Sequence, residues 1–221
     1  PERIAHLEGR RDCRFLRHDI TQNLPLDEQI DYLIHGASIA SPPTYRRYPL
    51  QTLDVNTTGT RNMLDLARRS GVTSFLYLSS SEIYGDPTPE NIPTPETYKG
   101  NVSCTGPRAC YDESKRLAET LCTVYYGEFG FPVKIARPFN VYGPALRLDD
   151  GRVVPDLLSN ALSGKAITLY SDGKATRSFC YVADAVTAMM LILFSSANGE
   201  AFNVGNDEET TIGFLASQVG E

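Results

Sequence analysis

The chain has 221 residues, enough for one full-sized hydrophobic core or for one domain and part of another. A hydrophobic fraction of 41% with 22% charged residues is typical of globular proteins and excludes a disordered or fibrous chain. The net charge of -6 excludes a general nucleic-acid-binding surface, which would need clustered lysines and arginines. The apolar runs are far shorter than the roughly 20 residues of a membrane-spanning helix, so we expect no membrane contact.

The cysteines and histidines exclude two further classes of protein. Five cysteines are an odd number and include no Cys-x-x-Cys pair, which favours free thiols in a reducing cytoplasm over a disulfide framework. The three histidines lack the close spacing of zinc ligands, so we expect no metal site.

Strand-like and helix-like runs alternate along most of the chain. This alternation predicts βαβ units, and therefore a parallel sheet with helices on both faces. In chain order, the expected elements are strands at 13–19 and 32–38, a helix at 48–70, a strand at 74–79, a long loop at 85–106, a helix at 107–129, a strand at 133–138, a helix at 154–163, short elements at 166–170 and 178–182, a helix at 183–194, a strand at 201–204 and a helix from 211.

Both ends of the chain interrupt this pattern. A dinucleotide-binding α/β fold carries a glycine-rich turn after its first strand, yet no Gly-x-Gly-x-x-Gly stands near residue 1. The last residues fall within a helical pattern. We therefore expect a fragment that lacks the first βαβ segment and the C-terminal end of its fold.

Tyr111 and Lys115 are four residues apart in a predicted helix and so share one helical face. A phenol is a poor proton shuttle near neutral pH, and we expect the lysine ammonium to lower the pKa of Tyr111. Tyr170 and Lys174 have the same spacing, but a turn-like Ser-Asp-Gly separates them, so we interpret that pair as coincidental.

A serine cluster follows the predicted strand at 74–79, where α/β sheets bind ligands. The Ser80 hydroxyl can hydrogen-bond the substrate oxygen from which Tyr111 removes a proton. Together with Lys115 these residues form a set suited to hydride transfer to a nicotinamide. Without the tyrosine and lysine, the serines would indicate only a turn.

Four stretches resemble extended short-chain dehydrogenases that act on nucleotide sugars, namely 54–60 (Asp-Val-Asn-Thr-Thr-Gly-Thr), 77–85, 111–115 and 136–144 (Ala-Arg-Pro-Phe-Asn-Val-Tyr-Gly-Pro). Within that group, the stretches 100–102, 106–113 and 150–154 are most similar to UDP-glucuronate decarboxylases. The resemblance implies a Rossmann-like NAD-binding domain at 1–145 and a nucleotide-sugar-binding part at 146–221, with 178–194 returning to the first domain. It also implies a homodimer packed through the helices around 57–66 and 115–126.

The implied reaction begins when NAD accepts a hydride from C4 of UDP-glucuronate while Tyr111 takes the hydroxyl proton. The resulting β-keto acid loses carbon dioxide, Tyr111 and Ser80 stabilise the enolate, and protonation of the enolate followed by return of the hydride gives UDP-xylose. Related 4,6-dehydratases pair the glutamate at position 82 with a preceding aspartate, where this chain has Ser81. A dehydratase, a 4-epimerase and a non-catalytic dinucleotide-binding protein stay as alternatives.

The resemblance also assigns residues to three groups. The catalytic candidates are Tyr111, Lys115, Ser80, Ser81 and Glu82. The cofactor-binding candidates are Asp19, Ile20, Ala37, Ser38, Ser41, Asn56, Ser79, Tyr111, Lys115 and Pro138. The substrate-binding candidates are Glu82, Arg108, Asn140, Arg152, Val153, Tyr170 and Arg177.

Overall fold

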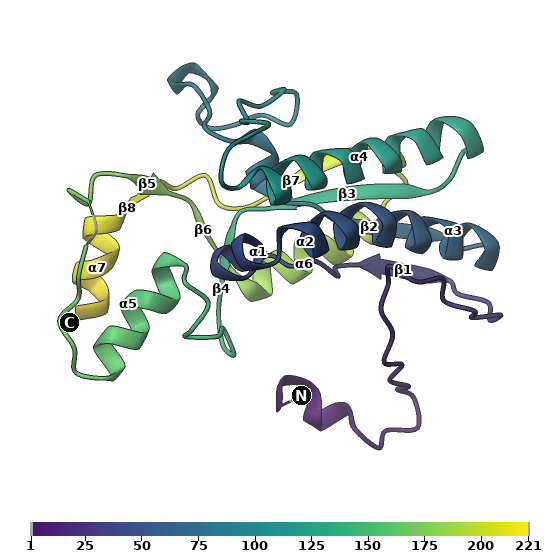
Figure 1. The fold of residues 1–221 in the computed structure, drawn as a ribbon, viewed down its shortest axis with the longest axis horizontal. Helices are drawn as coiled ribbons and strands as arrows, with labels where there is room; N and C mark the ends of the chain where they lie inside the picture. Colours follow the sequence, from purple (N-terminus) through teal and green to yellow (C-terminus); the bar gives the residue numbers. More distant parts are fainter. Residues whose placement is uncertain (1, 170, 221) are drawn as a thin grey trace.

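A four-stranded parallel sheet forms the centre of the structure, a computed structural model that describes residues 2–169 and 171–220. The strands are β1 (Tyr32–His35), β2 (Ser74–Leu78), β3 (Val133–Pro138) and β7 (Ala201–Val204), in the order β1-β2-β3-β7 (Figure 1). Because all four run in the same direction, their carboxyl ends lie along one edge of the sheet, and the loops that follow them meet there.

Helices cover both faces of this sheet, as the alternating pattern predicts. Phe75 and Tyr77 of β2 face α3 (Thr60–Ser70) and α4 (Ala109–Phe129), whereas Leu76 faces α6 (Val182–Phe194). Successive strand residues point to opposite faces, so one strand supplies both cores. Two apolar layers therefore sandwich β2 and β3, whose side chains are almost all buried.

The helix expected at 48–70 forms in three pieces. After α1 (Pro42–Arg47) come α2 (Pro49–Asp54), a π-helical turn η2 (Val55–Gly59) and α3. A π-turn inserts one extra residue into the helix and shifts the side chains that follow it. Gly71 ends α3 in the left-handed conformation, with φ of 65°, as expected for a glycine at a helix end.

A smaller group of elements lies at one end of the molecule, beside the sheet. It contains α5 (Val153–Leu162) packed on α7 (Ile212–Gly220), the antiparallel pair β5 (Thr176–Arg177) and β8 (Thr210–Thr211), and the parallel pair β4 (Asn140–Tyr142) and β6 (Phe179–Tyr181) (Figure 1). Short helical turns complete the fold at η1 (Glu2–Leu7), η3 (Ser81–Tyr84) and η4 (Pro89–Asn91).

Two expected elements are wrong. Residues 13–19 form no strand, and Phe15 and Leu16 remain half-exposed. A strand needs a neighbour to accept its ladder hydrogen bonds, and within the described residues β1 pairs only with β2. Residues 166–169 are also irregular, and Tyr170, with its expected strand position, lies outside the described residues.

The segment after residue 19 is held by side chains instead of by a ladder. Ile20, Leu24, Leu26 and Ile30 pack against the core between α3 and α4, and Asn62 of α3 donates to the Ile20 carbonyl at 2.8 Å. In the described part of the chain, no helix is both long enough and apolar enough to cross a membrane.

Candidate functional site

The serine cluster begins directly after β2, at the carboxyl edge of the sheet. Ser80 caps η3, because its side-chain oxygen accepts a hydrogen bond from the Glu82 backbone N–H at 3.2 Å. Ser79 turns the other way and donates to Glu119 of α4 at 2.5 Å. This short stretch therefore directs Ser79 into the interior, while Ser80 and Glu82 lie at the carboxyl edge of the sheet.

Tyr111 and Lys115 lie on the inner face of α4, and both are buried. Burial raises the pKa of Tyr111 to about 12, and a hydrogen bond with the Ser80 side chain opposes this only in part. Ser80 and Tyr111 are therefore in contact, as the sequence predicts.

The expected effect of Lys115 on the pKa of Tyr111 is wrong for this structure. The ammonium donates to the Leu78 carbonyl at 2.8 Å and lies 4.9 Å from the Tyr77 ring centre and 5.9 Å from that of Tyr111. Burial lowers the pKa of Lys115 itself to about 8. Desolvation is the largest cause of the pKa shifts of both Tyr111 and Lys115, because both side chains are buried.

The π-turn places Asn56 in the interior beside these residues. Its amide oxygen accepts from the Ser38 hydroxyl at 2.7 Å, and its amide nitrogen donates to Ser114 of α4 at 2.9 Å. Thr60, one turn later, donates to the Asn56 carbonyl at 2.7 Å and lies 3.0 Å from Nε2 of His35. The Thr60 hydroxyl proton is already donated to the Asn56 carbonyl, so Thr60 can only accept from His35. The neutral histidine therefore carries its proton on Nε2 and donates it to the Thr60 oxygen.

Some cofactor candidates meet at the carboxyl edge of the sheet, and some do not. Ala37 and Ser38 follow β1, Ser79 follows β2, and Pro138 ends β3. The Ser38 hydroxyl proton is used by Asn56, and Leu78 uses one of the three Lys115 ammonium protons, so the ammonium keeps two protons to donate. These ammonium donors fit the hydroxyl-rich ribose of a nicotinamide dinucleotide.

The remaining cofactor candidates lie elsewhere. Asp19 accepts from the backbone and side chain of Thr21, which lower the pKa of its carboxyl, and Ile20 packs into the core. Ser41 begins α1 and donates to the Asp150 carbonyl at 3.1 Å, so it joins the sheet domain to the loop before α5.

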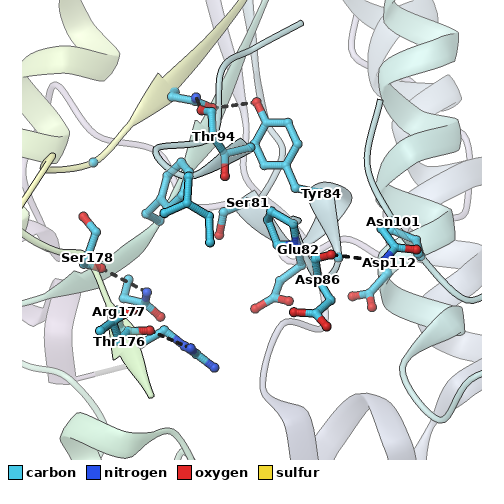
Figure 2. A pocket seen from close by; sticks show the side chains of 18 of the residues that line it. Ser81, Glu82, Tyr84, Asp86, Thr94, Asn101, Asp112, Thr176, Arg177 and Ser178 are labelled. Carbon is cyan, nitrogen blue, oxygen red and sulfur yellow. Dashed lines mark hydrogen bonds between the residues drawn. The ribbon is translucent and has the colours of Figure 1, made fainter. Parts of the chain in front are cut away.

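A cavity of about 800 Å³ opens between the carboxyl edge of the sheet and the smaller group of elements. Figure 2 shows Glu82, Asp86 and Asp112 on one side of it and Thr176, Arg177 and Ser178 on the other. The predicted site residues in its wall are Ser81, Glu82, Arg108, Asn140 and Arg177.

Three of the five catalytic candidates lie outside this wall. Ser80, Tyr111 and Lys115 are not among the described residues that line the cavity, although the neighbours Ser81 and Asp112 are. The Tyr45 ring of α1 stacks on Tyr111, with 5.2 Å between the ring centres and 12° between the planes. Tyr111 thus sits next to the cavity beneath an aromatic cover.

The three arginine candidates have different partners. Arg108 forms an ion pair with Glu82, and Arg152 forms one with Asp150. Arg177 donates to the Thr176 carbonyl at 2.7 Å and has no carboxylate partner among the described residues. Arg177 is therefore the cation of this group most available to a phosphate.

Arg152 and Val153 lie apart from the main cavity. Together with Asn140 they line a smaller hollow at the start of α5, and Asn140 also donates to the Ser178 carbonyl at 3.0 Å. Asn140 belongs to both walls and connects the two spaces.

The sequence reasoning missed several residues of the site. Asp112 and Asn203 line the cavity, and the buried Tyr45 hydroxyl, close to both Arg108 and Asp112, has no hydrogen-bond partner. The strand predicted at 201–204 indicates the position of Asn203, because its carboxyl end must reach the same edge as the others. No sequence signal marked Tyr45, whose role depends on the ring stacked against it.

Among the described residues, no group of three or more histidines, cysteines, aspartates or glutamates is placed to hold a metal ion.

The sequence of this chain is similar to those of known proteins. The profile of the NAD dependent epimerase/dehydratase family matches residues 2–205. The chain belongs to this family. One similar protein is UDP-glucuronic acid decarboxylase 1 of Danio rerio, which is 44% identical over 95% of this chain and 49% of its own length. Another is UDP-glucuronic acid decarboxylase 5 of Arabidopsis thaliana, which is 46% identical over 93% of this chain and 59% of its own length. The chain spans less than two thirds of the length of each.

Solved structures of epimerases and dehydratases show the same fold. UDP-glucose 4-epimerase of Thermotoga maritima, determined with UDP-glucose, matches with a TM-score of 0.78 and 27% identity, over 86% of this chain and 60% of that one. A dTDP-glucose 4,6-dehydratase of Streptomyces venezuelae matches with a TM-score of 0.83 over 99% of this chain and 66% of that one, and at 22% identity it supports the fold alone. The predicted family, the Rossmann-like fold and its incomplete length are confirmed.

The buried His35 makes the stability of the fold depend on pH. Burial, aided by the Lys115 ammonium, lowers the pKa of His35 to about 3, whereas the unfolded chain titrates near the ordinary value of about 6.5. The contribution of the neutral His35 to the free energy of unfolding is therefore complete above pH 6.5 and is lost as the pH falls towards 3. We expect the stability advantage of the wild type over His35→Gln to shrink by about 2 kcal/mol between pH 7 and pH 5.

Urea unfolding at the two pH values measures this difference. The matched control is His18→Gln, because His18 is exposed. A wild-type advantage that stays constant with pH would contradict the burial of a neutral imidazole.

Proposed function

We propose that the protein uses NAD to decarboxylate UDP-glucuronate to UDP-xylose through a 4-keto sugar. The observation that carries this proposal is the contact of Ser80 with Tyr111, next to a cavity whose wall contains Glu82. The printed names of the relatives at 44% and 46% identity support the choice of reaction.

The chain's own residues would divide the proton chemistry among them. Tyr111 would take the proton of the C4 hydroxyl, and Ser80 would hold the same oxygen by a hydrogen bond. Lys115 would place its positive charge near the Tyr111 ring. Asn56 would hold the loop after β1 against α4 through its hydrogen bonds with Ser38 and Ser114. NAD, when bound, accepts the C4 hydride and later returns it.

Decarboxylation follows from the chemistry of the 4-keto acid. The carboxylate at C6 is beta to the new ketone, so the electron pair released with carbon dioxide passes into an enolate. Tyr111 and Ser80 would donate to that enolate oxygen. Ser81 lines the cavity where dehydratases resembling this chain have an aspartate, so the acid needed to expel a C6 hydroxyl is missing.

Arg177 would hold the diphosphate of the nucleotide. A guanidinium can bond two phosphate oxygens in parallel, and Arg177 points into the cavity from β5 (Figure 2). Asn140 would contact the same group, and the backbone at Val153 would lie beside the uracil. Arg108 has a different role, because it already pairs with Glu82.

We further propose that 1–145 and 146–221 act as the cofactor and substrate parts, with α6 in the cofactor part because it packs on β2 and β3. A cytoplasmic location is also proposed, since the five cysteines are free thiols. Detection of the protein in a secreted fraction would contradict it.

The reaction is tested with the full-length protein, NAD and UDP-glucuronate. We expect release of carbon dioxide and formation of UDP-xylose, measured by mass spectrometry. Tyr111→Phe should reduce turnover by about 10²- to 10⁴-fold, the usual contribution of an acid–base group, while UDP still binds. UDP-galacturonate as the product, or a 4-keto-6-deoxy sugar from UDP-glucose, would instead identify an epimerase or a dehydratase.

The phosphate contact is tested by Arg177→Ala. Loss of one charged hydrogen-bonding group should weaken UDP binding roughly 10- to 100-fold in isothermal titration calorimetry. Lys174→Ala is the control, because its side chain is 86% exposed and lies outside the cavity wall. Equal UDP affinity in Arg177→Ala and the wild type would remove the diphosphate assignment.

The homodimer is tested by charge placed on an outer helical face. On α4, within the predicted contact helix around 115–126, Leu117 and Val124 are exposed apolar side chains that a second copy would cover. We expect a dimer in sedimentation velocity and a monomer for Leu117→Asp. A wild-type monomer, or an unchanged dimer in the variant, would contradict this face as the contact.

A further inference from the structure

Asp112 is a buried carboxylate that the proposed reaction does not use. It lies in the first turn of α4, directly after Tyr111, and reaches the cavity wall although its residue is only 7% exposed. One of its oxygens, Oδ1, is buried without a hydrogen-bond partner. A buried polar atom left unpaired is costly and is often retained at functional sites.

Arg108 connects Asp112 to the candidate catalytic residue Glu82. Its Nη2 pairs with the Glu82 carboxylate, while its Nε faces Asp112 Oδ2 at 3.6 Å, too far for a hydrogen bond. The guanidinium thus lies between two carboxylates, both of which line the same cavity. Asp112 approaches it from α4, and Glu82 approaches it from η3.

Two carboxylates share the single Arg108 cation, and Asp112 is the more buried of the two, with its side chain 10% exposed against 39% for Glu82. Burial raises the pKa of Asp112 to about 6, an effect that Glu82 and Glu113 strengthen and Arg108 opposes. The buried Tyr45 hydroxyl of α1 adds no charge.

We propose that Asp112 is a positioning residue: it anchors Arg108, which neutralises the Glu82 carboxylate and directs it towards the substrate. The step from Glu82 to substrate rests on the proposed function. UDP-glucuronate carries its own carboxylate, and an unneutralised Glu82 would repel it. The anchored arginine therefore lets a glutamate stand beside an acidic sugar.

A purely structural role for Asp112 gives different expectations. Carboxylates in the first turn of a helix stabilise it through the helix dipole, and loss of that effect lowers the melting temperature alone. Anchoring of Arg108 instead affects turnover and its pH dependence. As the pH falls through about 6, Asp112 takes up a proton and its hold on Arg108 weakens.

The test compares Asp112→Asn with the wild type, both full-length and loaded with NAD. We expect kcat for UDP-glucuronate to fall roughly 10- to 100-fold, the effect of losing one charged interaction, with the affinity for UDP unchanged. Wild-type kcat should decline below pH 6, and Asp112→Asn should lack this decline. Asp112→Glu, which keeps the charge, should recover part of the lost activity.

Glu113→Gln is the matched control, because Glu113 is the next carboxylate on α4 and pairs with Arg116 at 3.6 Å, away from Arg108. We expect its kcat at pH 7.5 to match the wild type and its acid decline to be kept, displaced slightly to lower pH because Glu113 helps to raise the pKa of Asp112. Normal turnover with an unchanged acid decline in Asp112→Asn would overturn the proposal.

A second measurement does not depend on turnover. Rotation of the Arg108 guanidinium, followed by ¹⁵N NMR, should accelerate about tenfold or more in Asp112→Asn, as expected when a charged contact is lost. An unchanged rotation rate would overturn the anchoring. Faster rotation in a protein whose wild type forms no UDP-xylose would preserve the anchoring and reject the proposed function.

Discussion

An ion pair between Glu119 of α4 and Arg137 of β3 joins the elements that carry the site. Arg137 donates from Nε and Nη2 to the two Glu119 oxygens at 3.0 and 2.7 Å, and both side chains are about nine-tenths buried. Ser79 donates to the same glutamate, which ties the end of β2 to α4. A buried charge pair is stable only when its remaining donors and acceptors are satisfied, so its surroundings are constrained as well.

Those surroundings extend to the far side of the cavity. Arg137 Nη1 donates to the Tyr84 hydroxyl at 2.7 Å and to the Glu96 carbonyl at 2.9 Å, and Tyr84 donates to Asn203 at 2.7 Å. The Asn203 backbone N–H donates to Glu96 Oε1 at 2.9 Å, and its side-chain amide donates to the Thr94 carbonyl at 2.8 Å. The serine turn, the long loop and the end of β7 are therefore fixed against one another, which gives the cavity a defined wall.

Burial explains the unusual pKa values around Tyr111. The Tyr111 phenol lies under the Tyr45 ring, and the Lys115 ammonium is buried against the Leu78 carbonyl and the Tyr77 ring, so desolvation raises the pKa of Tyr111 and lowers that of Lys115. The pKa of Tyr111 thus lies above its ordinary value, and the pKa of Lys115 lies below its own. Such a pair responds strongly to a new charge placed beside it, which suits a site whose proposed cofactor is a cationic nicotinamide ring.

The amino-acid sequence by itself determined the parallel α/β architecture, the helix that carries Tyr111 and Lys115, and the serine turn after β2. These features follow from local patterns: apolar runs for buried strands, four-residue spacing on a helix, and polar residues directly after a strand. The resemblance to nucleotide-sugar enzymes came from the same local stretches, and the family match confirms it.

Only the tertiary structure decided what depends on contacts between distant segments. The segment 13–19 has a strand-like composition but forms no strand, and the substrate-binding candidate Arg108 lies between the carboxylates of Glu82 and Asp112. The pKa of Tyr111 was expected to fall, yet burial raises it. Sequence spacing reports which side chains share an element, whereas desolvation and ion pairing depend on which other elements fold against them.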